Sequence, residues 1–149
     1  MMFLDDACTI WKQLEQRFSV TNGSRKYKLS KEIFDTKQNG KTVSEYYIMK
    51  VLWEELESLN ALPSITNITS EIRIFLKTLR THIDVQKLFQ FLNGLDDSFS
   101  AHRSHLLMQQ PLPSVDEACN MLQQEESQRE VLSNSKTDHN LVMFSKNND

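Results

Sequence analysis

Glycine, proline and cysteine are scarce in this sequence, and each scarcity excludes a class of structure. Three glycines and three prolines in 149 residues are too few for a strand-rich fold, which needs a turn about every ten residues. Two cysteines cannot form a cysteine-rich zinc module. Cys8 and Cys119 both fall on apolar faces of expected helices, so we expect buried free thiols rather than a disulfide.

Excess positive charge and long apolar runs are also missing. The 17 Lys and Arg residues stand against 20 Asp and Glu residues, a net charge of −3, which provides no electrostatic attraction to nucleic acid or to an anionic membrane. No apolar stretch approaches the ~18 residues of a membrane span. The first six residues also lack the basic start of a signal peptide. We therefore expect a soluble, cytoplasmic protein without a membrane partner.

Apolar residues recur at helical spacing along most of the chain, which predicts an all-α fold: a compact bundle of about six to seven helices. Trp11 and Phe18 belong to the expected core stripe of the first helix, and Trp53 to that of the third. The expected helices cover the first 20 residues, about 25–37, 42–59, 69–79, 84–93, 98–107 and 114–132, and turn residues at 21–24 separate the first two.

Local signals mark several helix ends. Thr42 with Glu45, and Ser114 with Glu117, have the spacing of a capping box, in which hydroxyl and carboxylate satisfy the first free N–H groups. Asp84 is expected to begin a helix, and Gly94 to end one in the left-handed conformation.

The domain organisation follows from composition. Residues 1–132 are expected to form the helical domain, with 63–70 as the place where two sub-bundles would meet. Residues 123–130 are polar on all sides and are expected to project into solvent. Residues 133–149 are polar enough to predict a disordered tail.

Residues 88–107, LFQFLNGLDDSFSAHRSHLL, combine acids with histidines. His102 and His105 are three residues apart and are candidates to share a metal, but a stable site needs a third ligand and oriented neighbours. Asp96 and Asp97 have a simpler use as caps of the following helix. We expect solvated histidines here. Because phosphate loops and nucleophile motifs are absent as well, the sequence predicts no catalytic residue, cofactor or metal.

Three further positions carry expectations. Arg103 falls inside an apolar arc, which predicts a packed stem and an ion pair with an acid of the preceding junction or of a neighbouring helix. Tyr47 and Val51 are four residues apart on the charged side of the helix expected over 42–59. An exposed aromatic–aliphatic pair there predicts an interface with another subunit or domain.

Three stretches together resemble a known family: WKQLEQRFSVTNGSRKYKL, KQNGKTVSEYYIMKVLWEEL and FLNGLDDSFSAHRSHLLMQQPLPSVDEACNMLQQEESQR. They are similar to the capsid region of Gag from copia-type LTR retrotransposons of plants, over residues 7–132. The specific motifs are W-x-x-L-x-x-R-F, V-S-E-Y-Y followed by L-W-E-E-L, F-L-x-G-L and R-S-x-L-L-x-x-x-P-L-P-S.

The resemblance implies a retroviral-capsid-like helical protein that associates with itself, or with other Gag copies, into a particle around element RNA. It implies no catalysis and no cofactor. The positions that match fold-defining positions of the family are Trp11, Leu14, Arg17, Phe18, Tyr46, Tyr47, Leu52, Trp53, Leu56, Phe91, Leu92, Gly94, Leu95, Arg103, Leu107, Pro111 and Pro113.

Two departures from the family shape these expectations. The part expected before the tryptophan helix is missing, and so is the zinc knuckle that grips RNA in complete Gag proteins. We therefore expect a capsid fragment, truncated at both ends, that meets RNA only indirectly. Two alternatives remain open: an RNA-binding protein that uses the basic cluster at 25–31, and a host-adopted helical adaptor.

Overall fold

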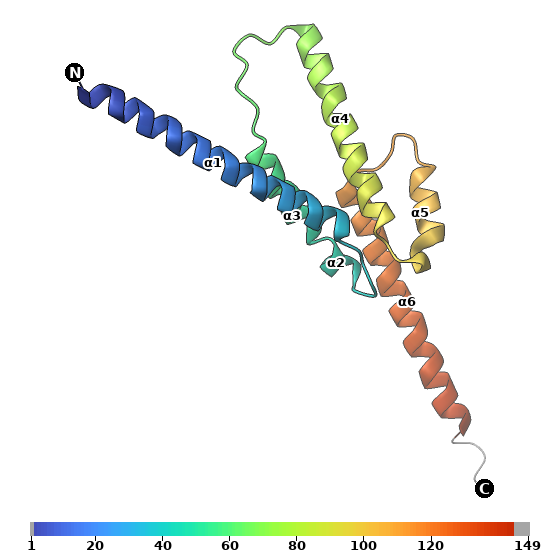
Figure 1. Ribbon diagram of the computed structural model, residues 1–149. Helices are drawn as coiled ribbons and strands as arrows, with labels where there is room; N and C mark the ends of the chain where they lie inside the picture. Colours follow the sequence, from blue (N-terminus) through green and yellow to red (C-terminus); the bar gives the residue numbers. More distant parts are fainter. Residues whose placement is uncertain (1, 145–149) are drawn as a thin grey trace. The chain divides into compact units, whose positions relative to one another are not determined.

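The regular structure of the described part of the chain is entirely helical (Figure 1). The computed structural model describes the backbone of residues 2–144 and the side chains of residues 7–15 and 23–135. Its elements are α1 (Met2–Asp35), α2 (Val43–Tyr46), α3 (Met49–Leu59), α4 (Ser70–Asn93), the 3-10 helix η1 (Asp97–Phe99), α5 (Ser100–Leu107) and α6 (Val115–Phe144). The predicted all-α class is confirmed.

The chain divides into two compact units. The first consists of Met1–Thr36 and Ile48–Thr66, the second of Lys37–Tyr47 and Asn67–Asp149. One crossing between units lies inside the range 63–70, whereas the crossings after residues 36 and 47 were not expected. The crossing after residue 47 coincides with an interruption at residues 47 and 48, which separates α2 from α3. The sequence predicted one continuous helix there.

In the first unit, α1 packs against α3. Leu29 and Ile33 of α1 are buried, as are Met49 and Trp53 of α3, which agrees with the core position predicted for Trp53. The predicted break at 21–24 is absent, because α1 runs continuously through Gly23. One glycine costs a helix only about 1 kcal/mol, and good helix formers follow it.

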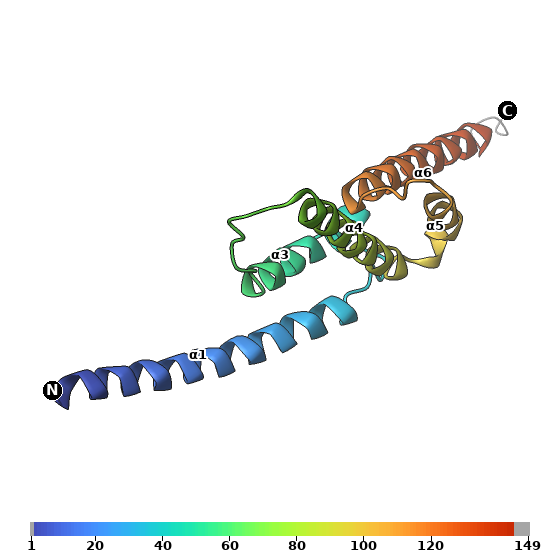
Figure 2. The same ribbon diagram turned by 90° about the horizontal axis from the view of Figure 1, so that it is seen from above.

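The N-terminal part of α1 extends past α3 (Figures 1 and 2). Trp11 is 72% exposed and Leu14 40% exposed, so their predicted core position is wrong in this structure; Cys8 is exposed too, and only Cys119 is a buried thiol. The physical reason is length, since α3 has 11 residues and α1 has 34. Phe18 lies outside the described side chains.

The second unit is built from α2, α4, η1, α5 and α6. Its core consists of apolar side chains from all five elements and from the turn after α4: Val43, Tyr46, Leu88, Phe91, Leu92, Leu95, Phe99, Leu106, Ala118, Cys119 and Leu122. Both predicted capping boxes are present. The amide of Glu45 donates to the Thr42 hydroxyl while the Glu45 carboxylate accepts from the Thr42 amide, and Glu117 and Ser114 repeat the arrangement.

One predicted helix end in this unit is wrong, and a second is right in position but not in conformation. Asp84 does not begin a helix, because α4 is continuous across it; its carboxylate instead lies 3.7 Å from the Arg80 guanidinium one turn earlier. Gly94 does follow the last residue of α4, but with a right-handed φ of −87°. In that conformation the Gly94 carbonyl accepts a hydrogen bond of 2.9 Å from the backbone amide of Gln38. This bond joins the 37–42 segment to the end of α4.

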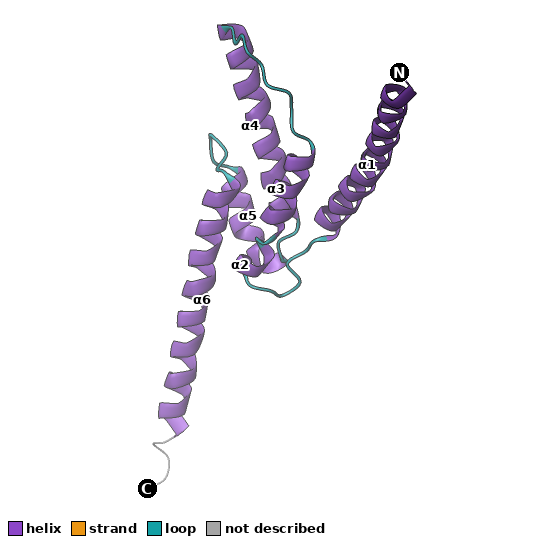
Figure 3. Cartoon of the chain, turned by 90° about the vertical axis from the view of Figure 1, so that its left-hand side faces the viewer, coloured by secondary structure: helices purple, strands orange, loops and turns teal. Residues whose placement is uncertain are grey.

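The C-terminal segment also differs from the prediction. Helix α6 continues to Phe144, where disorder was expected from residue 133, and its far half extends beyond the other helices of the unit (Figure 3). A helix satisfies its own backbone hydrogen bonds, so polar residues can continue one without joining a core. Residues 145–149 lie outside the described part of the chain.

Candidate functional site

The junction between α4 and α5 is held by Asp96 and Gln38. The Asp96 carboxylate accepts a hydrogen bond of 2.8 Å from the Gly40 amide, and its own amide donates at 2.9 Å to Gln38 Oε1. Asp96 makes no side-chain cap at η1, so the predicted capping role is wrong. Its carboxylate instead holds the turn at Asn39 and Gly40, both of which have positive φ.

Arg103 packs back across the same junction, as predicted, but through a different partner. Its guanidinium donates at 2.8 Å to the Leu95 carbonyl rather than to a carboxylate, and its buried Nε has no hydrogen-bond partner. The chain offers a carbonyl here because α4 has just ended, leaving carbonyls without intrahelical donors. The predicted ion pair is therefore replaced by a bond to the backbone.

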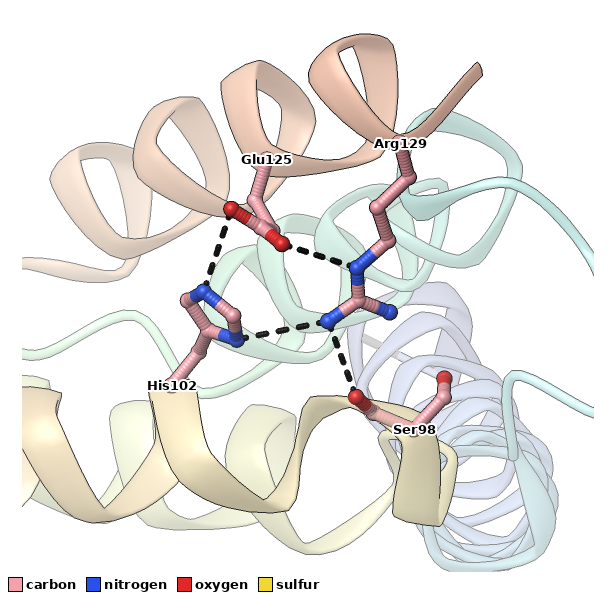
Figure 4. A network of polar contacts seen from close by, with 4 residues as sticks. All are labelled: Ser98, His102, Glu125 and Arg129. Carbon is pink, nitrogen blue, oxygen red and sulfur yellow. Dashed lines mark hydrogen bonds and ion pairs between the residues drawn. The ribbon is translucent and has the colours of Figure 1, made fainter. Parts of the chain in front are cut away.

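A polar cluster joins α5 and η1 to α6 (Figure 4). We call Ser98, His102, Glu125 and Arg129 the Arg129 cluster. Arg129 donates to Glu125 at 2.8 Å and to the Ser98 carbonyl at 2.9 Å, and contacts His102 Nδ1 at 3.4 Å. His102 Nε2 lies 3.2 Å from Glu125. The guanidinium carbon also lies 4.8 Å from the centre of the Phe99 ring, the distance of a cation–π contact.

The contacts within the Arg129 cluster affect the hydrogen-bonding roles of His102 and the pKa of Glu125. Because a guanidinium can only donate, the contact with Arg129 favours the neutral tautomer in which Nδ1 of His102 accepts and Nε2, facing Glu125, carries the proton. The hydrogen bond from Arg129 is the largest cause that lowers the pKa of Glu125. His102 is therefore half-buried and paired, so its predicted solvation is wrong, whereas His105 is exposed as expected.

A cavity of about 180 Å³ lies beside the cluster. Among the described residues that line it there is no serine, threonine or cysteine for His102 to activate. No group of three or more His, Cys, Asp and Glu side chains that could hold a metal ion occurs within the described residues. The arrangement is suited to joining helices.

The sequence reasoning missed this cluster because residues 123–130 were expected to face solvent only. Glu126 accepts hydrogen bonds of 3.2 Å from the Val43 amide, and Gln123 donates at 3.0 Å to Ser44, so part of this polar stretch contacts α2. The signal was present in the spacing of Glu125 and Arg129, which are four residues apart and form an ion pair across one helical turn.

The two residues of the predicted interface, Tyr47 and Val51, are divided between the two units. Tyr47 lies at the interruption after α2, where its ring contacts Phe91 edge-on at 5.6 Å and its hydroxyl donates to Asp116. Val51 lies in α3 and is 59% exposed. The interruption places the two residues in different units, and Tyr47 is already engaged inside its own unit.

The basic cluster at 25–31 is partly neutralised by carboxylates. Arg25 forms an ion pair with Glu55 of α3, and Lys28 lies 4.0 Å from Glu32 on the same helix. Both contacts partly neutralise positive charge that would otherwise attract phosphate groups.

A row of exposed and half-buried apolar side chains lies on the N-terminal half of α4. We call Ile72, Phe75, Leu76, Leu79 and Ile83 the α4 stripe; all five are exposed or half-buried. At ~100° per residue, the buried Leu88 and Leu92 lie about 160° and 200° around the helix from Ile72. The stripe therefore faces away from the core of its own unit.

Charge lines one side of this surface. Arg73, Arg80 and Lys87 are spaced seven residues apart, which places them in a row beside the α4 stripe. A partner of the stripe thus meets apolar side chains next to a basic edge.

Comparison with known protein families, with curated proteins and with solved structures finds no match to this chain. Within the described residues, no helix combines the length and apolarity needed to cross a membrane.

Proposed function

We propose that this chain is a Gag-type capsid building block, which acts in the cytoplasm by association with other copies of itself and performs no catalysis. Element RNA would be enclosed by the resulting particle and contacted only indirectly. The sequence resemblance over residues 7–132 supports this function, and the α4 stripe is the structural observation that carries it.

The α4 stripe favours association because of its exposure and direction. Soluble monomers rarely expose contiguous apolar patches larger than a few hundred Å². Phe75 alone is 65% exposed, and complete burial of such a side chain contributes about 1.5–3 kcal/mol. A face that points away from its own core gains this free energy only against another surface.

The test is the molecular mass of the purified chain over a concentration series, measured by light scattering and sedimentation. We expect the mass to rise with concentration. The double variant Phe75→Ser/Leu79→Ser should shift the rise to higher concentration.

The matched control is Ile74→Ser. Ile74 is 67% exposed and lies on the same helix, but about 150° around it from the centre of the α4 stripe at ~100° per residue. Its substitution should leave association unchanged. A wild-type chain that stays monomeric at every concentration would contradict the proposed function.

A further inference from the structure

Helix α1 carries a second uncovered apolar face, which continues the face that packs against α3. Trp11 and Leu29 are 18 residues apart, which is five full turns at ~3.6 residues per turn. The two side chains therefore lie on one line along α1. Leu29 is fully buried whereas Trp11 is 72% exposed, so the same face changes from covered to uncovered along the helix.

The length of α3 explains where the cover ends. Its 11 residues span about 16 Å, whereas the 34 residues of α1 span about 51 Å at ~1.5 Å per residue. The ion pair between Arg25 and Glu55 lies close to the last turn of α3. Ile10, Trp11 and Leu14 are 56%, 72% and 40% exposed beyond that point. An isolated helical segment of this length is marginal in water, so it gains most from a partner along this face.

We propose that a second copy of this chain covers this face, with its own α1 antiparallel about a two-fold axis. This inference rests on the proposed function and names a surface for it. In this arrangement, Trp11 of each copy packs against Leu14 of the other, because residues spaced four and three apart alternate along an antiparallel helix seam. The interface is self-complementary, as two-fold symmetry requires, and its centre is a tryptophan, a residue enriched at interface hot spots.

The charge pattern is compatible with a second copy as the occupant. Residues 7–15 contain one positive and one negative side chain, Lys12 and Glu15, and neither lies on the seam. In the antiparallel arrangement Glu15 of one copy lies opposite Cys8 of the other, so no like charges meet.

An antiparallel two-fold pairing of the α4 stripe would have a different result. An antiparallel pair of α4 helices would place Arg73 of one copy opposite Arg80 of the other, and like charges across such a seam are destabilising. The α1 face therefore suits an antiparallel two-fold pair, whereas the α4 stripe suits contact with a different surface of another copy.

The experiment uses Trp11 as its own reporter. The chain has two tryptophans, so Trp53→Phe leaves Trp11 as the only one. We expect its fluorescence emission to shift to shorter wavelength as concentration rises, together with the mass from light scattering. The unmodified chain provides a second measurement that needs no core substitution: acrylamide quenching of the exposed tryptophan should weaken over the same concentration range.

A surface variant completes the test. Trp11→Ser should raise the dissociation constant of the dimer about tenfold or more, as for an interface hot spot. Tyr27→Ser is the matched control, since Tyr27 is 73% exposed and lies about 160° around α1 from Trp11 at ~100° per residue.

The outcomes separate this inference from the proposed function. If the mass rises with concentration while Trp11 emission and quenching stay constant, the α1 interface is overturned and self-association stands. If the mass does not rise at all, both fail.

Discussion

The hydroxyl of Tyr46 donates a hydrogen bond of 2.9 Å to the carbonyl oxygen of Phe91, and the two rings stack with their centroids 5.3 Å apart. This contact joins α2 to the last turn of α4. Because α2 has only four residues, it is too short to be stable through its own hydrogen bonds. Its position in the unit depends on contacts such as this one.

Tyr46→Phe should therefore destabilise the second unit. The substitution keeps the ring but removes one of two donors to the Phe91 carbonyl, which also accepts from the Gly94 backbone amide at 3.2 Å. The loss of one such hydrogen bond costs about 0.5–1.5 kcal/mol. Chemical denaturation followed by circular dichroism measures the free energy of unfolding.

The same residue predicts a loss of stability at alkaline pH. Burial raises the pKa of Tyr46 from 10.0 to about 12, so the folded state holds the phenolic proton more tightly than the unfolded chain. The resulting stability is fully present below pH 10 and is lost as the pH rises from 10 towards 12. The unfolding free energy of the wild type should fall more steeply over this range than that of Tyr46→Phe. Equal slopes would contradict the assignment.

Gln38 is the buried polar residue on which the segment before α2 depends. It is 2% exposed; its amide group donates to the Lys41 carbonyl and accepts from the Asp96 amide, both at 2.9 Å. Gln38→Ala removes both bonds, each of which contributes about 0.5–1.5 kcal/mol.

Thermal unfolding checks this prediction, with Lys37→Ala as the control at an exposed neighbouring position. We expect Gln38→Ala to lower the melting temperature by several degrees and Lys37→Ala to leave it nearly unchanged. Similar melting temperatures for the two variants would show that the hydrogen bonds of Gln38 contribute little.

The sequence predicted what depends on local periodicity and local hydrogen bonds. The capping boxes at Thr42 and Ser114 were predictable because each joins groups three residues apart. The burial of Trp53 followed from apolar spacing within one short helix. The all-helical class followed from the same periodicity repeated along the chain.

What could not be predicted depends on partners that are distant in the sequence. Periodicity identified the stripe that contains Trp11, but whether a stripe is covered depends on the length of the helix opposite. The interruption after Tyr46 lies inside an uninterrupted apolar pattern, because the chain changes units there. Arg103 was expected to form an ion pair with a carboxylate. Its guanidinium instead donates to the carbonyl of Leu95, which follows the end of α4.

Two glycines should respond to alanine in opposite directions. Gly23 lies inside α1, and Gly40 has a φ of 76°; a Cβ at either position meets nothing within 4 Å. Gly23→Ala should stabilise the first unit by about 0.5–1 kcal/mol, since alanine favours the helix. Gly40→Ala should destabilise the second unit by about 1 kcal/mol or more, since its left-handed backbone strains an L-residue.

Denaturant titration of each variant measures these differences, and the pair acts as its own control because the substitution is the same. A stabilising effect at Gly40 would show that the turn there relaxes to negative φ. A destabilising effect at Gly23 would argue that α1 is interrupted at 21–24, as the sequence alone suggested.

Acid should weaken the Arg129 cluster. The pKa of Glu125 is lowered from 4.5, chiefly by the hydrogen bond from Arg129, so the folded state favours the carboxylate more than the unfolded chain does. The stability that this provides is present above pH 4.5 and is lost as the pH falls through the lower pKa of the folded state.

Arg129→Gln should therefore lower the melting temperature by several degrees at neutral pH, and the difference from wild type should shrink in acid. Arg80→Gln is the matched control, since Arg80 and Asp84 form a pair of the same spacing that is largely exposed, and such surface pairs contribute little. Melting curves of the three proteins at neutral pH and below pH 4.5 decide the matter, and a constant difference between Arg129→Gln and wild type across that range would contradict the role of Glu125.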